Sequence, residues 1–155
     1  MAAPDRRKHA SVWGDDWRCL RAEAIRAMGV WLCDLETEEL GFNINFWHWR
    51  AIVEIIRRLD VLDPSTVDGL HEQYVGTGLT REEARSVADA IEARVLGTLV
   101  KGERVKLDGT STTTPDDRIL HRPGTATFSE NFGTDREALS SFVEYLRTSN
   151  GFEVA

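Results

Sequence analysis

Apolar positions in residues 45–60 (NFWHWRAIVEIIRRLD) recur at the spacing of an α-helix and are denser than elsewhere in the chain. At 3.6 residues per turn, one half of the helix circumference is apolar. That half carries Phe46, Trp49, Ile52, Val53, Ile55, Ile56 and Leu59. The opposite half carries Arg50, Glu54, Arg57 and Arg58. The pattern predicts a central helix with one face in the core and one face in solvent.

Four further helices are predicted from capping residues followed by apolar stripes. Their start signals are Asp15 or Asp16, Asp63 with Pro64, Thr80 with Glu83, and Thr134 with Glu137. The helix after Thr80 has the steadiest stripe and is expected to run to residue 99. The last helix is expected to end at the Asn150-Gly151 pair, because glycine favours the left-handed conformation that terminates helices.

Few segments remain for strands. Residues 30–35 (VWLCDL) form a short apolar run that we assign to a strand, and residues 103–108 (ERVKLD) are expected to pair with residues 118–122 (RILHR) as a hairpin. Residues 36–41 are interpreted as a loop, and the GTG at residues 76–78 as a turn. The predicted fold class is therefore mainly α, with about five helices packed on one core and a small β-hairpin or short strands.

The length of 155 residues predicts one globular domain over residues 1–155, long enough to bury a single core. Residues 1–10 are expected to form a mobile tail. The polar run at residues 108–117 is expected to form a flexible loop, because it has little apolar surface to bury.

Charge narrows the function classes. The formal net charge is −7 at pH 7, which argues against a protein that binds nucleic acid through its overall field. The N-terminus has no signal-peptide pattern, and no run approaches the roughly 20 apolar residues that a membrane span needs. We therefore expect a cytoplasmic protein with no nucleic-acid or membrane partner. Cofactor motifs are also missing, so no cofactor is predicted.

Three phrases of the sequence together resemble a loose group of small bacterial proteins. They are WHWRAIVEII, YVGTGLTREEARSVADAIEARV and SSFVEYLRTSNGFEV. In that group a tryptophan-rich helix is followed by a Tyr-Gly turn, an alanine-rich amphipathic helix and a terminal Phe and Gly-Phe motif. The likeness covers residues 45–99 and 139–155. It implies the outline of the fold and transfers no function or catalytic residue.

Trp47 is the first candidate binding residue. On the helical wheel it projects about 100° from Phe46, onto the charged face. An aromatic side chain among charges needs a partner, which is either the N-terminal segment with Trp13 and Trp17, or a ligand or another protein. The predicted binding surface consists of Trp47, Arg50, Glu54 and Arg58. Glu54 lies four residues from both arginines, which also predicts a simple surface ion-pair ladder.

A second interpretation places a small-molecule pocket on the same helix. Its predicted lining is Trp47, His48, Arg50, Glu54 and His71. His48, His71 and His121 would bind a metal only if they converged in space, because no spacing puts two ligands on one helix face. No metal site is therefore predicted, and no catalytic residue is assigned.

Two function classes follow. The favoured class is a non-catalytic cytosolic interaction protein, most concretely a toxin-neutralising immunity-type protein that binds a basic partner. The acidic cluster Glu36, Glu38 and Glu39 suits electrostatic steering toward such a partner. The alternative is a small enzyme or ligand-binding domain that uses the pocket above. The sequence leaves open the identity of the partner and the oligomeric state.

Overall fold

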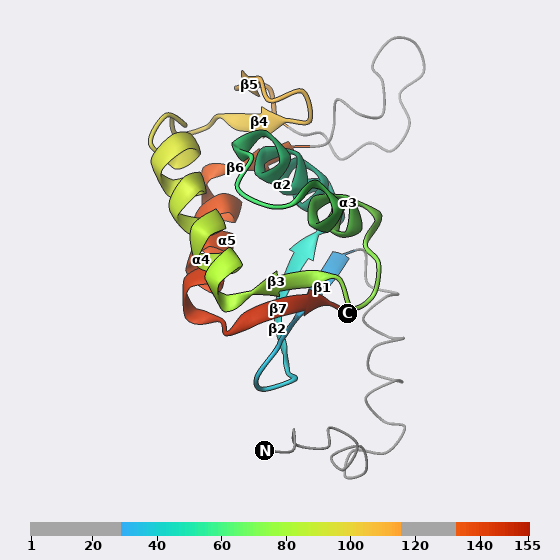
Figure 1. Ribbon diagram of the computed structural model, residues 1–155. Coiled ribbons are helices and arrows are strands. Elements are labelled where there is room, and N and C mark those ends of the chain that lie inside the picture. Colours follow the sequence, from blue (N-terminus) through green and yellow to red (C-terminus); the bar gives the residue numbers. More distant parts are fainter. Residues whose placement is uncertain (1–28, 116–132) are drawn as a thin grey trace, which may run out of the picture.

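The chain forms an α+β fold in the computed structural model, which describes residues 29–115 and 133–155 (Figure 1). The described residues contain four α-helices and seven strands in two antiparallel sheets. The prediction of a mainly α fold was therefore wrong. Short segments that carry little periodicity of their own become strands here, because they pair with segments far away in the sequence.

The larger sheet has the strand order β2-β1-β7-β3, and every pair in it is antiparallel. Its strands are β1 (Gly29–Asp34), β2 (Leu40–Asn45), β3 (Gly78–Thr80) and β7 (Gly151–Val154). The strand predicted at residues 30–35 is confirmed as β1. Strand β2 begins inside the segment that was interpreted as a loop, and this expectation was wrong. The turn expected at residues 76–78 includes Gly76, with φ of 85°, but its last glycine already belongs to β3. Gly151, which was expected to end the last helix, has φ of 91° and is also the first residue of β7.

The smaller sheet has the order β5-β4-β6. Its strands are β4 (Arg104–Lys106), β5 (Ser111–Thr112) and β6 (Gly133–Asp135). The expected hairpin strand is confirmed at β4, but its described partners are β5 and β6, and residues 118–122 lie outside the described residues. Part of the expected loop at residues 108–117 is thus β5.

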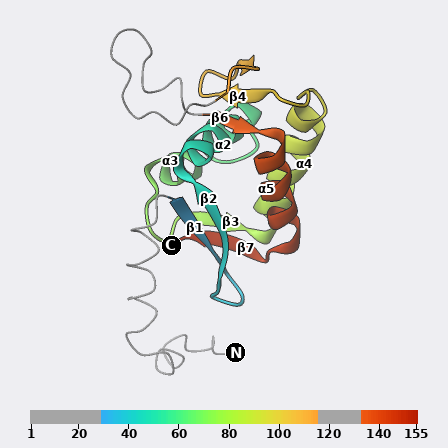
Figure 2. The same ribbon diagram turned by 180° about the vertical axis from the view of Figure 1, so that it is seen from behind.

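The helices lie between the two sheets, with α4 beside α5 (Figures 1 and 2). Their bounds are α2 (Phe46–Leu59), α3 (Pro64–Glu72), α4 (Arg81–Ile91) and α5 (Arg136–Thr148). A short π-helical segment, η1 (Glu92–Leu96), continues α4. All four helices were predicted; the helix expected at residues 15–28 and the tail at residues 1–10 lie outside the described residues.

Helix starts follow the predicted chemistry with one exception. The capping box is complete at Thr80: its hydroxyl accepts from the Glu83 amide at 3.2 Å, and the Glu83 carboxylate accepts from the Thr80 amide at 2.8 Å. At the last helix the predicted cap was one residue early. Asp135, the last residue of β6, is the N-cap and accepts from the Ala138 amide at 2.8 Å, whereas Thr134 is the middle residue of that strand.

The π segment changes the apolar stripe of the predicted helix 81–99. In a π turn each backbone hydrogen bond spans five residues instead of four. The next buried residue after Ile91 is therefore Leu96, five positions further along the chain. The Gly97 amide donates to the Glu92 carbonyl at 3.3 Å, as this geometry requires. Arg136 then donates to the carbonyls of Leu96 and Leu99 at 2.7 and 2.8 Å, which satisfies the end of the segment.

Trp49 joins three helices in the core. Its side chain is 0% exposed, and its indole Nε1–H donates to the Leu70 carbonyl of α3 at 3.2 Å. Its ring meets Phe142 of α5 edge-on, with centroids 6.3 Å apart. The prediction that Trp49 is a core residue of the central helix is confirmed.

Candidate functional site

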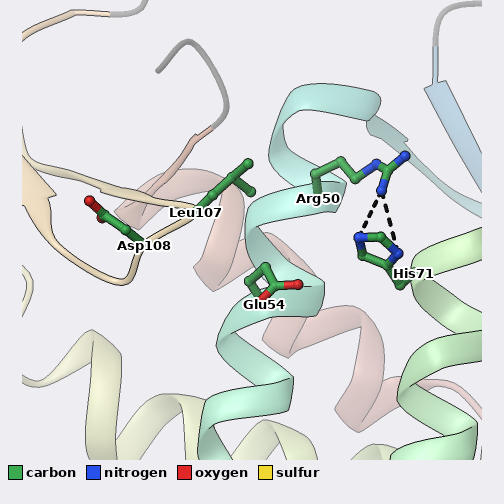
Figure 3. Close-up of a pocket in the computed structure, with 5 residues that line it drawn as sticks. All are labelled: Arg50, Glu54, His71, Leu107 and Asp108. Atoms are coloured by element: carbon green, nitrogen blue, oxygen red, sulfur yellow. Dashed lines mark hydrogen bonds between the residues drawn. The ribbon is translucent and has the colours of Figure 1, made fainter. Parts of the chain in front are cut away.

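An open depression of about 540 Å³ lies where α2 faces α3 and the turn after β4 (Figure 3). We call it the α2 depression; it is lined by Arg50, Glu54, His71, Leu107 and Asp108. Arg50 and Glu54 stand one turn apart on α2, because side chains four residues apart share a helix face. The structure thus brings together three residues of the predicted pocket and adds two from a segment that the sequence did not connect with α2.

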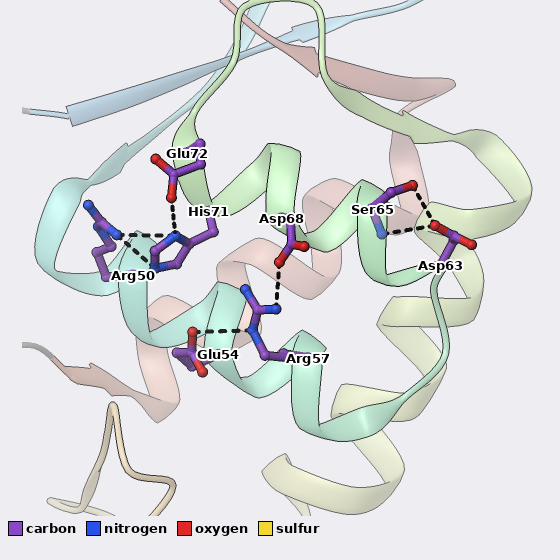
Figure 4. Close-up of polar contacts among 8 residues, drawn as sticks. All are labelled: Arg50, Glu54, Arg57, Asp63, Ser65, Asp68, His71 and Glu72. Atoms are coloured by element: carbon purple, nitrogen blue, oxygen red, sulfur yellow. Dashed lines mark hydrogen bonds and ion pairs between the residues drawn. The ribbon is translucent and has the colours of Figure 1, made fainter.

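Arg50 is held in a fixed position by His71. Its Nη1 donates to His71 Nε2 at 2.8 Å (Figure 4). Its guanidinium carbon lies 5.2 Å from the ring centroid of Phe46. On the other side of the imidazole, Nδ1 lies 3.1 Å from a carboxylate oxygen of Glu72. Because a guanidinium only donates, the imidazole is the acceptor in its contact with Arg50. The arrangement orients one cation at the rim of the depression.

The charged residues of α2 do not form the expected ladder. Glu54 pairs with Arg57 at 3.4 Å rather than with Arg50 or Arg58, and Arg57 also reaches Asp68 of α3 at 2.7 Å (Figure 4). Arg58 turns to the β4–β5 turn and donates to the Leu107 carbonyl at 3.0 Å. All three arginines of α2 thus bond to a neighbouring element: Arg50 and Arg57 to α3, and Arg58 to the β4–β5 turn.

Trp47 does not present its indole to solvent. Its side chain is 8% exposed, which is the outcome expected if the indole packs within its own chain rather than waiting for a ligand or another protein. It lies outside the main hydrophobic cluster and meets the Phe46 ring edge-on at 6.4 Å. A wheel gives the direction of a side chain but not what packs over it. Little of Trp47 is therefore accessible to a ligand or partner, and its place in the binding surface and the pocket stays a prediction.

The predicted histidine pocket is also divided. His48 faces the small sheet, where its Nδ1 lies 3.3 Å from the buried hydroxyl of Thr134, whereas His71 faces Arg50. His121 and the N-terminal Trp13 and Trp17 lie outside the described residues. Within residues 29–115 and 133–155, no group of three His, Cys, Asp or Glu side chains is placed to hold a metal ion.

A second feature is the turn between β1 and β2, which projects beyond the described body of the molecule (Figures 1 and 2). We call it the acidic hairpin tip; it consists of Leu35, Glu36, Glu38, Glu39 and Leu40. The two leucines are 47% and 39% exposed, although large aliphatic side chains are normally buried. All three glutamates are exposed as well. Glu36 pairs with Arg81 at 3.3 Å.

Asp34 holds the hairpin tip in one conformation. Its carboxylate accepts from the amides of Glu36 and Thr37 at 2.9 and 3.0 Å, and from the Asn150 amide at 2.9 Å. Burial acts to raise the pKa of this carboxyl, but the hydrogen bonds from Asn150, Thr37 and Glu36 outweigh it and lower the pKa to about 2. The tip is therefore preorganised and tied to the loop that enters β7.

Sequence reasoning missed the leucines of the tip and the contribution of Leu107 and Asp108. A usable signal existed for the tip: in LGFNIN apolar residues alternate with Gly or Asn, which is the pattern of a half-buried strand. Recognising that strand beside VWLCDL would have predicted a hairpin with an acidic turn. No signal in the sequence pointed to the turn after β4, because its place against Arg58 is a long-range contact.

No known protein family, curated protein or solved structure matches this chain. Within the described residues, none of the helices is both long enough and apolar enough to cross a bilayer.

Proposed function

We propose that this chain is a non-catalytic protein-binding domain that recognises a basic partner protein, and that the acidic hairpin tip is its contact surface. The more specific form of the proposal is a toxin-neutralising immunity-type protein that acts in the cytoplasm. The observation that carries the proposal is a projecting, preorganised turn with two exposed leucines among three glutamates. The α2 depression, by comparison, is open on its solvent side.

The two kinds of residue in the tip have different roles. Exposed leucines lose contact with water when a partner covers them, at roughly 25 cal/mol per Å² of apolar area, and so contribute to the lifetime of the complex. The glutamates raise the association rate with a positively charged surface and make that rate depend on salt. Because Asp34 already orders the turn, little conformational entropy is lost on binding.

The test uses the chain as bait in an extract of the organism that encodes it. Leu35→Ser with Leu40→Ser is expected to lose the captured partner, whereas Val100→Ser, which changes another exposed aliphatic residue far along the chain, is expected to retain it. Quantitative mass spectrometry compares the baits. Equal capture by both variants, or no partner at all under conditions that preserve weak complexes, would contradict the proposal.

The charge of the tip is tested with the captured partner. Replacing Glu36, Glu38 and Glu39 by glutamine is expected to slow association about ten-fold at low salt and to leave dissociation nearly unchanged. Stopped-flow mixing at several salt concentrations measures both rates.

A partner that arrests growth when expressed alone, and does not when this chain is co-expressed, would support the immunity form. A partner with a net negative charge would argue against both forms.

A second candidate function rests on the convergence of Arg50, Glu54 and His71 in the α2 depression. There Arg50 keeps donors that His71 does not use, and these suit a carboxylate or phosphate on a small ligand. Under this hypothesis a panel of acidic metabolites contains at least one that raises the melting temperature of the wild type. That shift disappears in Arg50→Ala and persists in Arg85→Ala, a surface arginine on α4. A panel without any such shift would remove this candidate.

A further inference from the structure

Strand β2 is an edge strand of the larger sheet in the part of the chain that the structure describes. The strand order puts β1 on one side of β2 and no described strand on the other. Gly41, Asn43 and Asn45 are all exposed along it. In Figure 2, β2 runs directly from the hairpin tip to α2. The free edge therefore begins where the acidic hairpin tip ends.

The hydrogen-bond register identifies a residue whose backbone faces this edge. The Trp31 carbonyl accepts from the Ala155 amide at 3.0 Å, so the backbone groups of Trp31 point toward β7 and away from β2. Asn43 is the residue opposite Trp31 in the β1–β2 pairing. In an antiparallel pair, residues opposite each other bond either to one another or to the outer sides. The N–H and C=O of Asn43 consequently point outward, to the free edge.

Apart from one bulge, the edge lacks the features that usually prevent strand pairing. Natural edge strands carry a lysine, a proline or an inward-pointing charge that blocks a further strand. The sequence of β2, LGFNIN, contains no charged residue and no proline. Its one irregularity is a bulge at Gly41, between the pairs Leu32–Phe42 and Cys33–Leu40, at the end nearest the tip. The remaining part of β2 is a regular, uncharged edge.

We infer that β2 accepts an extended segment of the basic partner as an additional strand, so that the larger sheet continues into the partner. This inference rests on the proposed function and specifies its mode of recognition. Backbone hydrogen bonds to Asn43 hold the segment, as in other cases of strand addition. The glutamates at the start of β2 select lysine or arginine in that segment by charge complementarity. A second copy of this chain is the competing occupant, and it would bring no such basic residues.

Asn43→Pro tests the inference directly. Proline removes the outward N–H and is tolerated on an edge strand whose N–H faces solvent, so the backbone bonds between β1 and β2 are kept and only the Asn43 side-chain bond to the Val30 carbonyl is lost. Asn43→Thr is the matched control, because it also loses the amide side chain but keeps the N–H. Circular dichroism and urea unfolding establish that both variants fold before any binding measurement is made.

The probe is a synthetic peptide in which valine alternates with lysine, with an N-methylated peptide of the same sequence as its control. Titration followed by NMR is expected to show binding to the wild type and Asn43→Thr, with slower hydrogen exchange at the Asn43 amide. Asn43→Pro and the methylated peptide are expected to bind at least about ten-fold more weakly, the loss expected for one or two backbone hydrogen bonds. Equal binding by Asn43→Pro and Asn43→Thr, or no binding of the peptide, would overturn the inference.

The same variants separate this inference from the proposed function. If the captured partner binds Asn43→Pro as well as Asn43→Thr but loses affinity on replacement of Leu35 and Leu40, the tip is the contact surface and strand addition is wrong. If analytical ultracentrifugation shows that the wild type dimerises and Asn43→Pro does not, the occupant is a second copy and the inference of a basic partner segment is wrong.

Discussion

At the scale of single residues, Asp34 has the clearest physical role in the described chain. One carboxylate collects amide donors from its own turn and from Asn150, which lies more than a hundred residues away. The charge on this side chain is what makes those bonds strong. Its low pKa follows from the bonds, so folding and protonation are linked at this position.

Asp34→Asn is expected to lower the free energy of unfolding at pH 7 by about 1–2 kcal/mol, because an amide accepts the same bonds more weakly. The native pKa of about 2 lies below the ordinary value of 3.8, so this contribution is present above pH 4 and is lost as the pH falls toward 2. Urea unfolding at a series of pH values measures both effects. Asp60→Asn, an exposed carboxylate outside the network, serves as the control. An acid limb of the same size in Asp34→Asn and wild type would contradict the assignment.

At the scale of elements, local signals decided where the helices start. The hydroxyl of Thr80 and the carboxylate of Glu83 exchange bonds with each other's amides, as their spacing predicts. The way in which that helix ends depends on contacts with residues that are distant in the sequence. The π segment aligns Leu96 with the core, and Arg136 from the next helix satisfies its end. The sequence of one segment cannot predict hydrogen bonds from an arginine that belongs to another segment.

Thr80→Ala is expected to destabilise the protein by about 1 kcal/mol, because the Glu83 amide loses its acceptor at the helix start. Thr80→Ser, which keeps the hydroxyl, is expected to recover most of this loss. Thr113→Ala, in the exposed turn after β5, is expected to stay within about 0.5 kcal/mol of the wild type. Chemical unfolding compares the free energies of the four proteins. A cost for Thr80→Ala no larger than that for Thr113→Ala would show that the capping box does not stabilise the fold.

At the scale of the whole molecule, Trp49 links α2 to α3 and α5. Trp49→Phe leaves a space in the core and removes one of the two donors to the buried Leu70 carbonyl, the other being the Gln73 amide, so we expect a loss of about 2–4 kcal/mol. Unfolding followed by circular dichroism and by intrinsic fluorescence is expected to give one shared midpoint, lowered in the variant. A loss below about 1 kcal/mol would mean that the three helices are held together by other contacts.

The residues of both candidate sites are brought together only by the tertiary structure. The sequence placed Arg50 and Glu54 on one helix face, which periodicity determines, but it did not place Leu107 or Asp108 beside them. It placed Glu36, Glu38 and Glu39 in one cluster, but not at the tip of a hairpin. For Trp47 the wheel gave the side of the helix but not the exposure, because burial depends on what covers a side chain rather than on its direction.

The sequence by itself determined the four described helices, their core faces and most of their caps, because helices are made by contacts within a few residues. Only the tertiary structure decided the two sheets, the exposed leucines at the hairpin tip and the free edge of β2. Strands bond to neighbours that are distant in the sequence: β7 pairs with β1 across more than a hundred residues. A four-residue segment such as GFEV is too short for its periodicity to predict that pairing. It becomes a strand because it bonds to β1 on one side and to β3 on the other.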